Sequence, residues 1–188
     1  MPARAVVSSS YSQDQALSQL LFSPLYRTLA PDLQELVRTA VSLYTRERRQ
    51  GLQFSDYSFI VFPMAKAYEG FLKQYLFQLR LLTPQEYQDR HFRIGRALNP
   101  DLRHHQRDEQ WLYDDIVRLC SEDLGRMLWD TWLQCRNRVF HYFPAATTRI
   151  SLEHAGEYLM IIVSAMTEAR NCQLDKENGR RAHQNAHR

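Results

Sequence analysis

The residues best suited to chemistry are an arginine and a histidine five positions apart, in the stretch from Arg136 to His141, RNRVFH. An arginine stays charged at every physiological pH and can bind a phosphate through two parallel hydrogen bonds. A histidine titrates near neutrality and can move a proton in the same site. With the amide of Asn137 beside the arginine, these groups favour metal-free RNA cleavage, for which we expect no cofactor.

The spacing alone is a weak signal, because it recurs elsewhere in the chain. Arg149 and His154 have the same separation, and two arginines stand six or seven residues before His187. Chance is therefore a competing explanation. The setting favours the first pair, since Asn137 follows its arginine and an amphipathic segment over residues 119–135 precedes it.

Glu69 is the second residue with chemical potential. It lies in a helical row that is otherwise apolar, formed by Phe62, Ala65, Leu72 and Leu76. A carboxylate in such a row is costly unless a cation pairs with it, and Arg136 is one candidate. The alternative is that Glu69 lies at the edge of the row and points to water.

The arginine and the histidine also have structural alternatives. An arginine at the end of an aromatic helix can pair with a glutamate or bind the last carbonyls of that helix. His141 stands among Phe140, Tyr142 and Phe143, where it could be a hydrogen-bonded core histidine.

Hydrophobic periodicity predicts the helices that must position these residues, and no strand pattern competes. One helix begins at Pro31-Asp32 and runs to about Gln50. The longest, capped by Ser55 or Asp56, extends to about Leu82 with a buried stripe at Tyr57, Ile60, Val61, Met64, Tyr68, Phe71, Tyr75 and Leu79. Others are expected over residues 13–22, 85–98, 109–119, 121–135 and 151–174, with Ser121 and Ser151 as caps.

These elements predict an all-α bundle of four or five main helices. We expect a flexible arm over residues 1–12, a single helical domain over residues 13–174 and a disordered polar tail over residues 175–188. The hydrophobic fraction of 44% and the aromatic fraction of 12% are typical of a folded globule.

The charge balance is mildly basic, and its bases are mostly arginine. The net charge of +3 is too small to identify a nucleic-acid partner by itself. Only Lys66, Lys73 and Lys176 are lysine among the 24 basic residues. Arginine suits phosphates and stacked bases better than lysine does, although a GC-rich genome would produce the same bias.

The cysteines and the hydropathy pattern predict a cytoplasmic protein without a membrane span. Cys120, Cys135 and Cys172 are odd in number and form no CxxC motif, which favours reduced thiols and no disulfide framework. The first residues lack the apolar run of a signal peptide, and no run of about 18 apolar residues exists.

The polar loop over residues 99–108 offers weaker candidates. Arg103 and Arg107 could extend an RNA groove. His104 and His105 suggest a metal, but adjacent histidines point in different directions and the spacing fits no known site. We expect no metal.

The arginine, the polar residue after it, and the histidine before the last long helix resemble the motif of the HEPN superfamily. Within it, residues 57–166 resemble the ribonuclease domain of RnlA/LsoA-type bacterial toxins. The resemblance is carried by Ala67-Tyr68-Glu69-Gly70-Phe71, by Ile94-Gly95-Arg96-Ala97-Leu98-Asn99 and by the stretch from Arg136 to His141.

This resemblance implies a HEPN-like helical bundle and a metal-independent endoribonuclease that acts as a toxin or defence effector. It implies a homodimer, cleavage that leaves 2′,3′-cyclic phosphate and 5′-hydroxyl ends, and an antitoxin or inhibitor protein as a possible partner. His141 would be the general acid or base and Arg136 the phosphate ligand, while Asn137 would orient either. Glu69 would position Arg136 or transfer a proton, and Arg138 would bind the substrate.

Two other functions compete with the ribonuclease. One is a non-catalytic helical module for dimerisation or partner binding. The other is a HEPN partner of a nucleotidyltransferase, a branch that usually has a tyrosine two residues after the histidine. Phe143 holds that position here, which counts against this branch.

Overall fold

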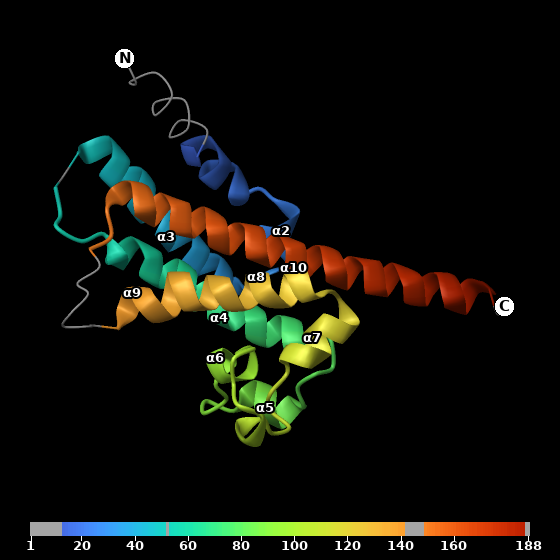
Figure 1. The fold of residues 1–188 in the computed structure, drawn as a ribbon. Coiled ribbons are helices and arrows are strands. Elements are labelled where there is room, and N and C mark those ends of the chain that lie inside the picture. Colours follow the sequence, from blue (N-terminus) through green and yellow to red (C-terminus); the bar gives the residue numbers. More distant parts are fainter. Residues whose placement is uncertain (1–12, 52, 142–148, 187–188) are drawn as a thin grey trace, which may run out of the picture. The chain divides into compact units, whose positions relative to one another are not determined.

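The computed structural model describes residues 13–51, 53–141 and 149–186, with side chains described up to Asp175. These residues form helices joined by turns and loops and contain no strand, which confirms the all-α class (Figure 1). Among them, no helix is long and apolar enough to cross a membrane. The predicted arm over residues 1–12 lies outside the described residues.

The chain divides into two compact units. One consists of Met1–Phe71 with Thr131–Val163, and the other of Leu72–Asp130 with Ser164–Arg188. Each boundary falls inside a helix: α4 (Ser58–Gln78), α8 (Glu122–Trp132) or α10 (Leu152–Ala186). The single domain and the HEPN-like arrangement of helices stay predictions.

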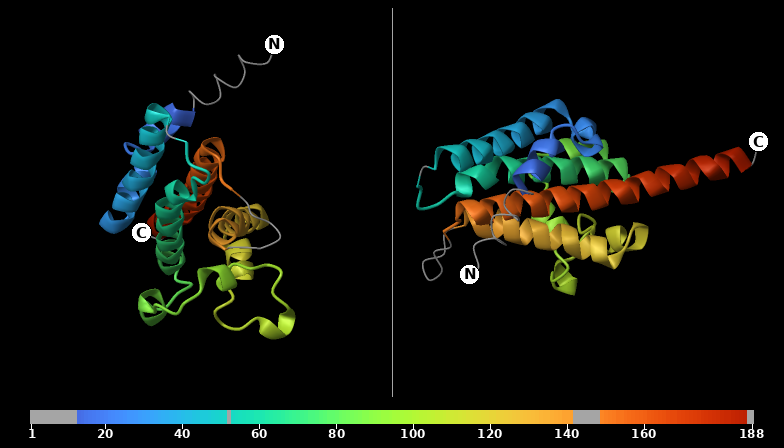
Figure 2. Two further views of the ribbon diagram at one scale, coloured as in Figure 1. Left: turned by 90° about the vertical axis from the view of Figure 1, so that its left-hand side faces the viewer. Right: turned by 90° about the horizontal axis from the view of Figure 1, so that it is seen from above.

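The first unit is built around α3 (Pro31–Gln50) and the first part of α4, and it also holds the short α2 (Pro24–Thr28). Pro31 begins α3 and Gly51, with φ 62°, ends it. The stripe predicted for α4 is confirmed, because all its members from Tyr57 to Leu79 are buried. Helix α10 packs closely on α3, since a Cβ at Gly156 would lie 2.6 Å from Oη of Tyr44 (Figure 2).

Helix α4 ends earlier than predicted, at Gln78 rather than near Leu82. Arg80 adopts φ 62°, and Leu81 N–H donates to the carbonyl of Leu76 at 2.9 Å. This hydrogen bond closes the helix end as in a Schellman motif, but with arginine where glycine is usual.

The second unit contains α5 (Pro84–Gln88), α6 (Ile94–Ala97), the 3₁₀ turn η1 (His104–Gln106) and α7 (Tyr113–Leu119). The continuous helix expected over residues 85–98 is wrong. The backbone N–H of His91 donates to Oδ1 of Asp89 at 2.8 Å, and this local turn separates α5 from α6. Helix α7 is likewise shorter than expected, because Gln110 N–H donates to Oδ1 of Asp108 in a second such turn.

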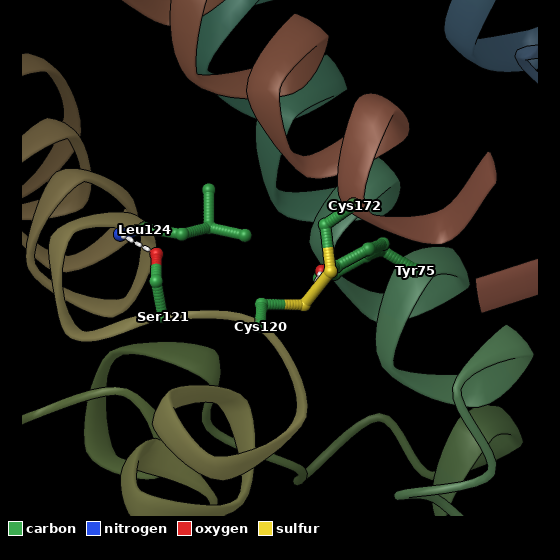
Figure 3. Close-up of a disulfide and its surroundings, with 5 residues drawn as sticks. All are labelled: Tyr75, Cys120, Ser121, Leu124 and Cys172. Carbon is green, nitrogen blue, oxygen red and sulfur yellow. Dashed lines mark hydrogen bonds between the residues drawn. A yellow bond between two sulfur atoms is a disulfide. The ribbon is translucent and has the colours of Figure 1, made fainter. Parts of the chain in front are cut away.

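The expectation of three reduced cysteines is wrong for two of them. Cys120, which follows α7, forms a disulfide with Cys172 of α10, and their Cα atoms lie 6.0 Å apart (Figure 3). The hydroxyl of Tyr75 lies 3.3 Å from Sγ of Cys120. Cys135 keeps a free, buried thiol. The disulfide removes the argument for a reducing compartment, so the cytoplasmic location stays a prediction.

Helix α10 is longer than predicted. It was expected to end near Leu174, but it continues to Ala186 through residues assigned to the polar tail. Lysine, glutamate, arginine and glutamine are good helix formers, so a polar composition does not by itself end a helix. The predicted caps at its start and at α8 are confirmed: Ser151 Oγ accepts from His154 N–H and Ser121 Oγ from Leu124 N–H.

Candidate active site

Arg136 lies in a π-helical turn, η2 (Leu133–Asn137), which follows α8 directly. Arg138 N–H donates to the carbonyl of Leu133, the i→i+5 hydrogen bond that defines this wider turn. The sequence predicted ordinary α-helix up to Cys135. Single π turns inside helices occur frequently at functional sites, which makes this turn the first structural feature in favour of the predicted site.

The π turn also changes where side chains five residues apart point. In a regular α-helix, five residues rotate by roughly 500°, so residues i and i+5 lie about 140° apart around the axis. In a π turn, these residues are neighbours across one turn. The pair that this turn brings together is Leu133 and Arg138, whereas His141 lies three residues beyond it, after α9 (Arg138–Phe140).

Arg136 forms an ion pair with Glu69 of α4. Its Nη2 lies 3.7 Å from Oε2 of Glu69, and the two side chains are 36% and 41% exposed. The separation exceeds hydrogen-bond length. The guanidinium also lies over the ring of Trp132, 5.0 Å from its centroid. Arg136 is thus the ion-pair partner of Glu69, while the 41% exposure of Glu69 also fits the alternative that this carboxylate lies at the edge of the row and meets water. A carboxylate and an indole lie beside the guanidinium.

His141 ends α9 (Arg138–Phe140) in an extended conformation, with φ −100° and ψ 130°. It is exposed to solvent, so the alternative of a buried core histidine is wrong. Asn137 is half-buried at the last position of η2, and Arg138 is exposed. Tyr142 and Phe143 lie outside the described residues.

Two successive contacts join α4 to the segment that carries Arg136 and His141. Phe62 meets Phe140 edge to face, with ring centroids 5.4 Å apart. Seven residues further along α4, Glu69 meets Arg136. The two segments are therefore antiparallel, and Phe140 marks the end of the site at which His141 lies.

A buried layer supports the candidate site. Tyr68 and Cys135 are both 0% exposed, and Thr131 is 2% exposed. Burial raises the pKa of Tyr68 well above its ordinary value, although a hydrogen bond with Thr131 lowers it. Burial raises the pKa of Cys135 to about 12, which keeps its thiol protonated and unreactive. The sequence did not reveal the link between Tyr68 and Thr131.

Two tryptophans near the candidate site are part of the chain's own core. Trp129 is 8% exposed and Trp132 is 6% exposed. Side chains this deeply buried leave little area for contact with a second copy of the chain. Trp132 packs beneath the guanidinium of Arg136.

Arg103 and Arg107 belong to the second unit. Arg107 is engaged by its own loop: Nε donates to the carbonyl of Leu102 at 2.9 Å, and the guanidinium lies 4.1 Å from the centroid of Trp111. Arg103 precedes η1 and is exposed. Their role in binding RNA stays a prediction.

The same unit holds a polar pocket of about 280 Å³ lined by His91, Arg93, Arg96 and Asp108. Within it, Arg96 Nη1 lies 2.7 Å from Oδ1 of Asp108, and this hydrogen bond lowers the pKa of the carboxyl. No group of three or more histidine, cysteine, aspartate or glutamate residues in the described part of the chain is arranged to hold a metal ion.

Comparison of the chain with family models, curated proteins and solved structures finds no match. The resemblance to HEPN ribonucleases therefore stays a prediction from the motif residues.

Proposed function

We propose that the protein is a metal-independent endoribonuclease whose site contains Arg136, His141, Asn137 and Glu69. The observation that carries the proposal is the position of Arg136. It sits in a π turn, over the ring of Trp132 and beside the carboxylate of Glu69, five residues before an exposed histidine. The exposed third of its side chain leaves the guanidinium accessible to a phosphate.

The proposed reaction is transesterification within RNA. The 2′-hydroxyl loses its proton to a base and attacks the adjacent phosphorus, while the bond from phosphorus to the 5′ oxygen breaks. The leaving oxygen receives a proton, and the products carry a 2′,3′-cyclic phosphate and a 5′-hydroxyl. His141 supplies one of the two proton transfers. Arg136 binds the non-bridging oxygens, whose negative charge grows in the transition state.

Glu69 and Trp132 hold the guanidinium before the substrate arrives. Because the pair is 3.7 Å apart, longer than a hydrogen bond, the carboxylate orients Arg136 without occupying its donors through short hydrogen bonds. The indole face restricts the plane of the guanidinium. Asn137, next to Arg136 in the same turn, orients a phosphate oxygen or His141.

The resemblance to HEPN ribonucleases supports a homodimer and an antitoxin or inhibitor protein as partners. A dimer would place two copies of the site near one interface. Sedimentation at tens of micromolar should give the mass of two chains. A strictly monomeric chain with full activity would contradict this part of the proposal.

Cleavage of RNA by the purified protein in EDTA tests the proposal. Arg136→Ala and His141→Ala should each reduce cleavage by about 10²- to 10⁴-fold with little change in thermal stability. Arg149→Ala and His154→Ala are matched controls, because these exposed residues have the same spacing. They should remain within a few-fold of wild type.

Three results would overturn the proposal. One is activity that disappears with EDTA and returns with a divalent ion. Another is retained activity in His141→Ala together with loss in the control variants. The third is complete absence of cleavage with a folded protein and a broad panel of RNAs. Expression in bacteria gives an independent readout, since the wild type should arrest growth and His141→Ala should not.

A further inference from the structure

Helix α4 exposes a stripe of side chains that leads to Glu69. Its members are Phe59, Phe62, Lys66 and Glu69, spaced three, four and three residues apart, which places them on one face of the helix. Phe59 is 37% exposed and Phe62 is 54% exposed, and Lys66 is also exposed. We refer to Phe59, Phe62 and Lys66 as the α4 stripe.

Both apolar members of the α4 stripe are phenylalanines. Phe59 contacts the ring of Phe54, itself 49% exposed, with centroids 5.4 Å apart. Phe62 contacts the ring of Phe140 at 5.4 Å. These edge contacts fix the rings while leaving large parts of them in water. Exposed aromatic rings that gather on one face form a candidate binding surface.

The stripe is continuous with the candidate active site. Phe62 and Glu69 are seven residues apart, so their Cα atoms are separated by about 10 Å along the helix axis. That length corresponds to roughly three stacked nucleotides at ~3.4 Å each. Lys66 lies between them, where it can meet a phosphate.

We propose that the α4 stripe binds single-stranded RNA beside the phosphate held by Arg136, with bases on Phe59 and Phe62 and a phosphate on Lys66. Aromatic rings that stack bases, combined with cations that follow the backbone, are the general means of binding single strands. The assignment of the phosphate at Arg136 rests on the proposed function; the binding of RNA to the stripe is tested separately.

A second copy of the chain fits the stripe less well. A seam between helices is favoured by aliphatic residues that interlock, and Lys66 would place a charge at its centre. The same lysine complements the negative charge of an RNA backbone. The α4 stripe contains no aliphatic side chain of the kind that interlocks in such a seam.

The test is binding of a fluorescent 2′-O-methyl oligoribonucleotide to the full chain, because its blocked 2′ oxygen cannot attack the phosphate. Phe62→Ala should weaken binding by about 5- to 150-fold, the range for loss of one stacked base. Phe62→Leu, which keeps an apolar side chain without a π face, should weaken binding similarly. Phe62→Trp should retain it. Lys66→Ala should make the slope of log affinity against log salt less negative by about 0.7.

Phe22→Ala is the matched control, since Phe22 is 76% exposed but lies before α2. It should bind as wild type does. Absence of binding by wild type, or equal binding by wild type, Phe62→Ala and Lys66→Ala, would overturn the inference. So would full binding by Phe62→Leu, or conversion of a dimer to monomers by Phe62→Ala with unchanged affinity per chain.

The two proposals can fail independently. If wild type cleaves RNA but the stripe variants bind normally, only the stripe assignment fails. If the stripe variants lose binding while no RNA is cleaved, the stripe assignment stands and the ribonuclease proposal fails.

Discussion

Replacement of Glu69 by glutamine tests whether this carboxylate orients Arg136 for cleavage or only stabilises the fold. The amide keeps the volume of the side chain and removes its charge, so the ion pair with Arg136 is lost without a cavity. At the observed 3.7 Å, two unit charges in water interact by about 1 kcal/mol. Because the two side chains are 36% and 41% exposed, solvent screening lowers the net value to roughly 0.2–1 kcal/mol.

We therefore expect Glu69→Gln to reduce the free energy of unfolding by about 1 kcal/mol or less, measured by urea titration. The effect on cleavage should be larger. A reacting group displaced by about 1 Å can lose roughly 10²-fold in rate, so the turnover number should fall by about 10- to 100-fold. The acid limb of the pH–rate profile distinguishes the two roles: it is retained if Glu69 orients Arg136 and lost if Glu69 transfers a proton.

The control is Glu35→Gln, which breaks the comparable ion pair between Glu35 and Arg38 on α3. It should cost a similar small amount of stability and leave cleavage unchanged. If Glu69→Gln lowers stability by more than about 2 kcal/mol while cleavage by the folded fraction is unchanged, the carboxylate is structural and the reasoning is refuted.

Three further predictions concern the scaffold. Reduction of the disulfide between Cys120 and Cys172, which are 52 residues apart, should lower the free energy of unfolding by about 4 kcal/mol and Tm by roughly 10 °C. Reductant should not change the Tm of Cys120→Ser, which lacks the disulfide. The raised pKa of Cys135, about 12 in the folded chain against an ordinary 9.0, contributes stability that is fully present below pH 9 and is lost as the pH rises towards 12. Urea midpoints should therefore fall less above pH 9 in Cys135→Ala than in wild type; equal slopes would contradict this. Arg80→Gly should stabilise by about 1 kcal/mol because Arg80 has φ 62°, whereas Gln78→Gly, inside the last turn of α4, should destabilise.

Periodicity predicted the core of the long helices because burial on one face is a local property of the sequence. The apolar face of α4 that runs from Tyr57 to Leu79 is buried as expected. The second row of α4 was also informative: Ala65 is 1% exposed and Leu72 and Leu76 are 0% exposed. Within this second row, only the side chains of Phe62 and Glu69 are exposed to solvent. These two side chains also contact the segment that carries Arg136 and His141.

The features that the sequence did not reveal depend on side chains that compete with the backbone or meet across the fold. Asp89 breaks a helix by accepting a hydrogen bond from the N–H of His91. The partner of Cys120 lies 52 residues away, and sequence spacing says nothing about which cysteine approaches it. The π turn at Arg136 rests on a single i→i+5 hydrogen bond, and the apolar spacing of so short a segment does not distinguish it from an ordinary helical turn.

The comparison of the two equally spaced pairs shows why backbone context, rather than spacing, favours Arg136. His154 lies in the first turn of α10, and its N–H is used by the Ser151 cap. Arg149 lies before that cap, so the pair spans the start of an ordinary helix. Arg136 and His141 instead span a π turn and the end of α9, where the chain leaves helical geometry. In addition, the carboxylate of Glu69 lies beside the guanidinium of Arg136. If the control pair proved to be the active one, backbone setting would not identify the site, and Arg136 and His141 would be wrongly assigned.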